Sequence, residues 1–186
     1  MTQPLRYAIN VTLDGCCSHQ EGVPPNSESM AFWTHELRRS DTLLYGRVTY
    51  EMMREAWRRP ECGVWPDWMD TDDYPFAEII DGMPKVVASA TLDAVDWNAE
   101  LLHGDVVDAV RRLKERPGRG IALGGVQLPA ALAAAGLIDE YTFVVHPVVA
   151  GRGPRLLDGV GKQLKLELIE RWEFGSGAIV QRYRSV

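Results

Sequence analysis

Residues 43–51 read Leu43-Leu44-Tyr45-Gly46-Arg47-Val48-Thr49-Tyr50-Glu51, and they are the most informative stretch of the chain. A short apolar run ends at Gly46, and helical spacing begins at once behind Arg47, so the pattern predicts a strand that turns directly into a helix. The first N–H groups of such a helix lack partners, and its dipole favours negative charge. A cation placed there indicates a site for a phosphate group.

A second junction of the same kind follows at residues 121–128, which read Ile-Ala-Leu-Gly-Gly-Val-Gln-Leu. Gly124 and Gly125 stand between a strand and a helix, and the N–H groups of Val126 and Gln127 are free at the helix start. Neither junction has the full glycine pattern of a Rossmann fingerprint or a P-loop. The glycine pair either cradles a ligand or lets the helix pack closely on the sheet. Two such junctions together favour a nucleotide or another diphosphate ligand.

The hydrophobic pattern predicts strands and helices that follow one another along the whole chain. Predicted strands cover residues 5–13, 42–45, 85–88, 101–102, 121–123, 141–149, 164–174 and 178–184, and predicted helices cover 27–39, 47–57, 74–80, 105–116 and 126–135. Ser27 or Ser29 is the expected cap of the first helix, and Val48, Met52, Met53 and Ala56 are the expected buried face of the second. We expect one α/β domain over residues 1–186, with a mostly parallel sheet, helices on both faces and a C-terminal antiparallel hairpin.

Composition excludes several classes of protein. The chain has 186 residues, of which 46% are hydrophobic and 25% charged, as in a globular protein. Its net charge of −6 argues against a nucleic-acid surface. No stretch approaches the about 20 apolar residues of a membrane span, and no signal-peptide pattern opens the chain. We therefore expect a cytoplasmic protein without membrane or nucleic-acid partners. Cys16, Cys17 and His19 lack a distant partner pair, so we expect no metal site.

Residues 58–73 resist packing into a helix or strand, because they contain Pro60, Gly63 and Pro66 among several aspartates. A long irregular segment in a small domain is typical of a functional loop or a lid. The equal alternative is that Trp65 and Trp68 cover part of the core or a dimer surface.

Several motifs in order resemble one family. They are Thr12-Leu13-Asp14-Gly15, residues 44–51, Val86-Val87-Ala88-Ser89-Ala90-Thr91-Leu92, Leu123-Gly124-Gly125, residues 137–141 and residues 146–154. Together they span nearly the whole chain and resemble the dihydrofolate reductase-like superfamily, in the branch of the C-terminal reductase domain of bacterial riboflavin biosynthesis proteins.

The resemblance implies a nicotinamide coenzyme, normally NADPH, along the carboxyl edge of the sheet. By position, Gly46, Arg47 and Thr49 would hold phosphate groups. Ser89 and Thr91 would border the adenosine, and Gly124, Gly125, Val126, Gln127 and Leu128 would hold the diphosphate. Thr12, Asp14 and Gly15 would lie near the nicotinamide and the substrate. The resemblance also implies a homodimer.

Three departures from the family pattern narrow these expectations. Ala90 stands where many relatives carry an arginine that grips the 2′-phosphate, so NADH is an alternative to NADPH. Met30 stands near the place of the acid that binds folate, with Glu28 two residues away, and Val145 precedes His146 in place of a threonine. Folate is therefore not the expected substrate. The zinc signature of the riboflavin deaminase domain is absent from the sequence, so we expect a stand-alone reductase domain.

Three side chains have two readings each. Asp14 is our candidate to supply a proton, although Asp-Gly is also a common turn pair. His146 is expected to be a core histidine bonded to backbone rather than a catalyst. Trp33 either lines an aromatic substrate pocket or belongs to the core. The leading hypothesis is an NAD(P)H-dependent reductase of a small heterocyclic or carbonyl compound, and the alternative is a non-catalytic nucleotide-binding module with the same crevice.

Overall fold

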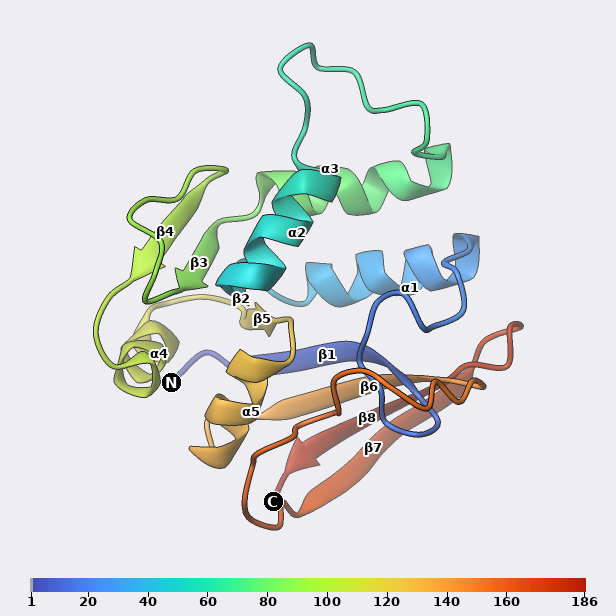
Figure 1. The fold of residues 1–186 in the computed structure, drawn as a ribbon. Coiled ribbons are helices and arrows are strands. Elements are labelled where there is room, and N and C mark those ends of the chain that lie inside the picture. Colours follow the sequence, from blue (N-terminus) through green and yellow to red (C-terminus); the bar gives the residue numbers. More distant parts are fainter. Residues whose placement is uncertain (1) are drawn as a thin grey trace.

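In the computed structural model, which describes residues 2–186, strands and helices follow one another as far as His146, and an antiparallel hairpin ends the chain (Figure 1). The strands are β1 (Leu5–Thr12), β2 (Thr42–Gly46), β3 (Lys85–Ala88), β4 (Ala99–Leu102), β5 (Ile121–Leu123), β6 (Glu140–His146), β7 (Leu166–Glu173) and β8 (Ile179–Ser185). The helices are α1 (Ser27–Arg38), α2 (Arg47–Trp57), α3 (Tyr74–Gly82), α4 (Val106–Glu115) and α5 (Gln127–Ala134), with a 3-10 turn, η1 (Thr71–Asp73).

All strands belong to one sheet in the order β4-β3-β2-β5-β1-β6-β8-β7. From β4 to β6 the neighbouring strands are parallel, whereas β8 runs antiparallel to both β6 and β7. The parallel strands carry apolar side chains on both faces because helices cover both faces. The predicted architecture, a mostly parallel sheet with a terminal antiparallel hairpin, is therefore confirmed.

Two hydrophobic cores lie on opposite faces of the sheet (Figure 1). Side chains of α4 and α5, such as Val110 and Leu132, pack with Tyr7 of β1 on one face. Side chains of α1, α2 and α3, such as Met30, Tyr50 and Ile80, pack on the other. No helix within residues 2–186 is long and apolar enough to cross a membrane.

Most boundaries lie within two residues of the sequence prediction, and two of the differences have a clear physical cause. Asn26, rather than Ser27 or Ser29, caps α1: its side chain accepts the amide of Ser29, and the Ser29 hydroxyl accepts the amide of Asn26. Such reciprocal bonds satisfy two amides that the helix leaves free. Strand β6 ends at His146 instead of Val149, because Pro147 has no N–H to donate to the ladder.

The prediction of the buried face of α2 was wrong for Val48 and Met52, whereas Met53 and Ala56 are half-buried and Met53 packs against the core. Val48 and Met52 are 66% and 36% exposed, whereas Tyr50 is 4% exposed. The Tyr50 ring lies 6.4 Å from that of Trp97, and its hydroxyl bonds to Asp96. A large aromatic side chain with a satisfied hydroxyl buries more area than a valine or methionine, so it decides how the helix is rotated.

Residues 58–73 form a long irregular connection between α2 and α3 (Figure 1). Trp65 and Met69 are buried against Ala77 of α3, so part of this segment covers core, as one reading of the sequence predicts. Trp68 is 59% exposed and meets the Trp57 ring edge-on at 6.1 Å. A role as a lid stays a prediction.

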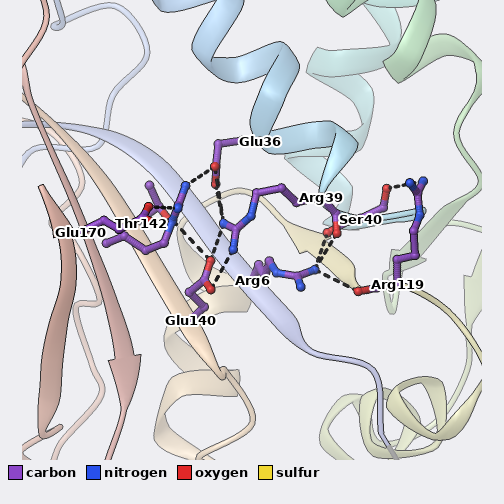
Figure 2. A network of polar contacts seen from close by, with 9 residues as sticks. Arg6, Glu36, Arg39, Ser40, Arg119, Glu140, Thr142 and Glu170 are labelled. Carbon is purple, nitrogen blue, oxygen red and sulfur yellow. Dashed lines mark hydrogen bonds and ion pairs between the residues drawn. The ribbon is translucent and has the colours of Figure 1, made fainter. Parts of the chain in front are cut away.

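A network of buried charges joins α1 to the antiparallel part of the sheet (Figure 2). Arg182 of β8 is 6% exposed and pairs with Glu36 of α1 and Glu170 of β7. Arg39, which follows α1, donates to Glu36 and to Glu140 of β6 at 3.1 and 2.9 Å. Buried charges are tolerated only when they are paired in this way, and the sequence pattern did not predict the network.

Candidate functional site

The carboxyl ends of the parallel strands place the predicted site residues along one edge of the sheet. Gly46 of β2 is beside Ala88 of β3, and Leu44 of β2 is in register with Leu123 of β5. On the other side of β5, Thr12 at the end of β1 is in register with His146. The segments that follow these strands, which carry the predicted coenzyme contacts, are therefore neighbours in the order β3, β2, β5, β1.

The two strand–glycine–helix junctions meet and form one cradle, which we call the crevice and define as residues 46–49 and 124–128. A Cβ atom on Gly46 would lie 3.8 Å from Leu128 Cβ, an ordinary contact. A Cβ atom on Gly125 would lie 2.5 Å from Thr49 Oγ1, and Gly125 has a φ of +98°. Only glycine fits at this position, because a side chain there would be both strained and in collision with Thr49.

The helices that start at the crevice have open N-termini. Neither α2 nor α5 has a side-chain cap or an acidic residue in its first turn. The side chains of Asn26 and Asp105, by contrast, cap α1 and α4. The free N–H groups and the positive dipole ends of α2 and α5 therefore offer two adjacent anion sites.

Arg47 stands at the start of α2 with its side chain 46% exposed. Its guanidinium lies 3.0 Å from the carboxylate of Glu51, one helical turn further on. The sequence analysis missed Glu51 as a neighbour of the site, although an i, i+4 spacing on a helix predicts the contact. An exposed pair of this kind is weak, so Arg47 can exchange it for a phosphate group.

The segment after β3 is shaped by its own hydroxyl group. Ser89 Oγ accepts the amides of Thr91 and Leu92 at 3.1 and 3.0 Å, which makes a tight turn beside the end of β2. Ala90 is exposed on this turn. The predicted adenosine contacts, Ser89 and Thr91, thus lie next to the crevice.

Thr12 and Gly15 form a turn at the end of β1. The amide of Gly15 donates to the carbonyl of Thr12 at 2.9 Å, and Gly15 has a φ of +83°. The hydroxyl of Thr12 donates to Asp14 and accepts the amide of Cys16 at 3.0 Å. The Thr12 hydroxyl therefore makes its hydrogen bonds within the protein and is not free to bond to a ligand.

The carboxylate of Asp14 ties two loops together. Besides Thr12, it accepts the amides of Ala150 and Gly151 at 3.0 and 2.8 Å, and Arg155 lies 3.3 Å away. The Thr12 hydroxyl and then the two amides hold the pKa of Asp14 well below its usual range. The structure therefore shows Asp14 in a turn, as one interpretation of the sequence predicts. An ionised carboxylate has no proton to donate at neutral pH, so a catalytic role for Asp14 stays a prediction that this pKa disfavours.

Replacing Asp14 with asparagine is expected to remove one source of acid sensitivity. The folded-state pKa is lowered, so the carboxylate contributes stability above its unfolded pKa of about 4 and loses it as pH falls below that value. Urea unfolding at several pH values would therefore show a shallower loss of stability between about pH 5 and pH 3 in the variant. Parallel curves for the variant and the wild type would contradict this account.

The remaining predicted side chains lie on α1 and at the end of β6. Trp33 is half-buried and packs edge-on against Phe32 at 5.0 Å, so its observed contacts belong to the core. Glu28 accepts the amide of Gly175 in the β7–β8 turn at 2.8 Å, and Met30 is buried. The His146 ring bonds to the backbone amide of Val23, as expected of a core histidine.

Cysteine chemistry does not contribute to the site. Cys16 and Cys17 are buried, and burial raises the pKa of Cys17 to about 11. Cys62 is exposed and distant in sequence from the other two. Within residues 2–186, no three histidine, cysteine or acidic side chains are grouped as a metal site would require.

Two surface hollows lie at the opposite edge of the sheet, by the amino ends of β2 and β3. Their volumes are about 300 and 390 Å³. Lys85 borders the first, but its ammonium donates to the carbonyls of Asp81 and Met83 and lies 3.9 Å from the centre of the Trp97 ring. Burial lowers the pKa of Lys85 to about 8. These contacts commit Lys85 to the packing of Trp97. The crevice at the carboxyl edge, with its two uncapped helix starts, is therefore the better candidate site.

The family model that describes the RibD C-terminal domain matches residues 4–180, nearly the whole chain. The chain belongs to the RibD C-terminal domain family. A Bacillus subtilis (strain 168) relative of this RibD C-terminal domain, named "Uncharacterized protein YyaP", is 29% identical over 180 residues, which cover 92% of the chain and 89% of the relative.

Solved structures show the same fold. A putative riboflavin biosynthesis protein from Shewanella sp. PV-4 aligns over 100% of the chain and 99% of its own length, with a TM-score of 0.73 and 20% identity. A pyrimidine reductase-like protein from Corynebacterium diphtheriae aligns over 99% of the chain and 92% of its own length, with a TM-score of 0.67 and 13% identity. This RibD C-terminal domain therefore has the dihydrofolate reductase-like fold that its motifs predict.

A longer relative shows how the domain is used elsewhere. A Thermotoga maritima protein, described as a diaminohydroxyphosphoribosylaminopyrimidine deaminase and 5-amino-6-(5-phosphoribosylamino)uracil reductase, aligns over 100% of the chain with a TM-score of 0.66 and 17% identity. The chain spans 57% of that protein.

Proposed function

We propose that the protein is a reductase that uses a nicotinamide coenzyme, NADPH or NADH, to reduce a small heterocyclic or carbonyl compound. One observation carries this proposal: two uncapped helix N-termini meet beside glycines at the carboxyl edge of the sheet. The family to which the chain belongs includes reductase domains. A diphosphate needs both the free N–H groups and the close backbone approach that glycine allows.

The residues of the crevice fit such a coenzyme. Arg47, Thr49 and the open end of α2 would hold phosphate, and the amides of Gln127 and Leu128 would hold the diphosphate. The bound coenzyme would supply a hydride, and the protein would orient the rings and exclude water. Because Asp14 is held as an anion, we propose that a proton needed by the substrate comes from solvent.

A non-catalytic binding module is the second candidate, and the bonding of the Asp14 carboxylate favours this function. A carboxylate whose hydrogen bonds are already made to Thr12, Ala150 and Gly151 is compatible with a crevice that only binds a nucleotide. The two functions differ in one measurable result: a reductase oxidises NADPH when its substrate is present, whereas a module binds NADPH and leaves it unchanged. A screen of heterocyclic and carbonyl compounds by NADPH absorbance would separate them.

Replacing Arg47 with alanine is expected to weaken NADPH binding by about 1–3 kcal/mol, the value of a charge-assisted hydrogen bond. Titration followed by tryptophan fluorescence would measure the dissociation constants of NADPH and NADH. Arg111→Ala is the matched control, because Arg111 is an equally exposed arginine that pairs with Asp108 on α4. Absence of binding of either coenzyme at millimolar concentration would defeat the proposed function, and an unchanged affinity in Arg47→Ala would defeat the phosphate assignment.

We also propose that the protein forms a homodimer, which rests on the family resemblance alone. Sedimentation at several concentrations would measure the mass directly. A monomer at all concentrations would contradict this part of the proposal.

A further inference from the structure

His146 is a buried titratable residue that the proposed coenzyme site does not use. It is the last residue of β6, is 7% exposed and stands in register with Thr12 at the carboxyl edge of the sheet. Its Nε2 atom lies 2.9 Å from Asn10 Oδ1 of β1, and its Nδ1 atom accepts the amide of Val23 at 3.2 Å. Both ring nitrogens therefore have a partner inside the protein.

These partners determine the protonation of the ring. The amide of Val23 can only donate, so Nδ1 must present a lone pair and the ring hydrogen must be on Nε2. From Nε2 that hydrogen points to the Asn10 oxygen, which accepts it. Burial of the ring lowers the pKa of His146. At neutral pH the ring is therefore neutral and held in one orientation.

The ring lies beneath segment 18–25, the irregular connection between β1 and α1. A Cβ atom on Gly22 would lie 3.5 Å from the ring, so the backbone of the segment rests on the imidazole. A second tether of the segment is the ion pair of Glu21 with Arg152 at 2.9 Å, and the Arg152 side chain is 77% exposed. Exposed pairs contribute little to stability, so His146 is the stronger of these two tethers.

We propose that His146 is a positioning residue that holds segment 18–25 beside the carboxyl end of β1, near Thr12. This inference deepens the proposed function and rests on it, because the family resemblance implies a substrate near Thr12 and Gly15. The tether itself needs neither coenzyme nor substrate, so it can be tested in the free protein.

Acid should release the segment. The segment itself carries His19 and Glu21, and Glu21 pairs with Arg152. Asp14 in the turn after β1 is bonded to the Ala150 amide, and Glu28 of α1 is bonded to the Gly175 amide. Within residues 2–186, neither ring nitrogen contacts a charged group. A second proton, on Nδ1, would face the N–H of Val23 and break that bond.

The sign of the pH dependence follows from the lowered pKa. The open segment exposes a histidine with an ordinary pKa of about 6.5, whereas the closed segment binds a proton less readily. The tether is therefore complete above about pH 6.5 and weakens as pH falls below that value.

Amide hydrogen exchange of segment 18–25, corrected for the intrinsic rate, tests the proposal at about pH 7.5 and about pH 5.5. In the wild type, protection should fall by up to about tenfold per pH unit below the ordinary pKa. His146→Asn places an oxygen acceptor near the position of Nδ1 that does not titrate, so protection should persist at both pH values. His146→Leu should lose protection at both, while amides of α4 serve as the internal control.

Wild-type protection in His146→Leu, or the same acid loss in His146→Asn as in the wild type, would overturn the positioning role. If His146→Leu does not fold, the wild-type profile and the asparagine variant still decide the question. NADPH binding by the wild type is measured alongside. Failure to bind NADPH would defeat the proposed function and leave the exchange result standing, whereas normal binding with pH-independent protection would defeat the positioning role alone.

Discussion

Replacing Arg182 with leucine is expected to lower the free energy of unfolding by about 3–5 kcal/mol, because removal of one partner leaves buried charge without compensation. Arg182 faces Glu36, whose side chain is 7% exposed, and also approaches Glu140 at 3.5 Å. Its guanidinium lies 5.3 Å from the centre of the Trp172 ring, so leucine would also lose this contact. Urea unfolding followed by tryptophan fluorescence would measure the change.

Arg184→Leu is the control for this prediction. Arg184 lies two residues after Arg182 on β8 and pairs with Glu167 at 2.6 Å. Both of these side chains are more than half exposed. Exposed pairs contribute about 0–1 kcal/mol, so this variant should stay close to the wild type. Equal losses in the two variants would show that the buried network of Figure 2 has no special role in stability.

Replacing Gly125 with alanine is expected to damage both the fold and the crevice. The new Cβ atom would lie 2.5 Å from Thr49 Oγ1, and the φ of +98° disfavours any side chain. Overpacking together with backbone strain should cost about 1–3 kcal/mol of stability. Relief of the collision has to displace either the Thr49 side chain or the start of α5, and both belong to the crevice. NADPH binding should therefore weaken by about tenfold, which is about 1.4 kcal/mol.

Gly136→Ala separates strain from collision. Gly136 also has a positive φ, of +70°, but a Cβ atom there would meet nothing within 4 Å. It should cost only the strain, about 1 kcal/mol, and leave NADPH binding unchanged. The double variant Gly125→Ala/Thr49→Ala, which removes the colliding oxygen, should recover part of the stability. Wild-type stability and binding in Gly125→Ala would refute the cradle.

Local patterns predicted the architecture well because each element depends on few neighbours in the sequence. The apolar run 43–45, its stop at Gly46 and the helical spacing behind Arg47 predicted the β2–α2 junction, and the alternation in residues 164–174 predicted β7. The order of motifs predicted the family. A rule about parallel sheets placed both junctions at one edge, since carboxyl ends of parallel strands share it, and the structure shows that β2 and β5 are neighbours there.

Long-range contacts account for what the sequence analysis missed. The rotation of α2 depends on Trp97, which lies 47 positions after Tyr50, and the state of Asp14 depends on the amides of Ala150 and Gly151. The tether of His146 to Val23 spans 123 positions. No spacing rule connects residues so far apart, because the sheet order brings them together only after the chain has folded.

Periodicity, glycine and helix-start signals act over a few residues, so they predict the class of fold and the edge of the sheet that carries the two junctions. The order of motifs predicts the family. Which of the predicted site residues are free depends on the folded chain. In the folded chain, Thr12 and Asp14 make internal hydrogen bonds, and the starts of α2 and α5 stay uncapped. Thr49 packs against Gly125. The reason is that a donor or acceptor is available to a ligand only when no distant part of the chain has already satisfied it.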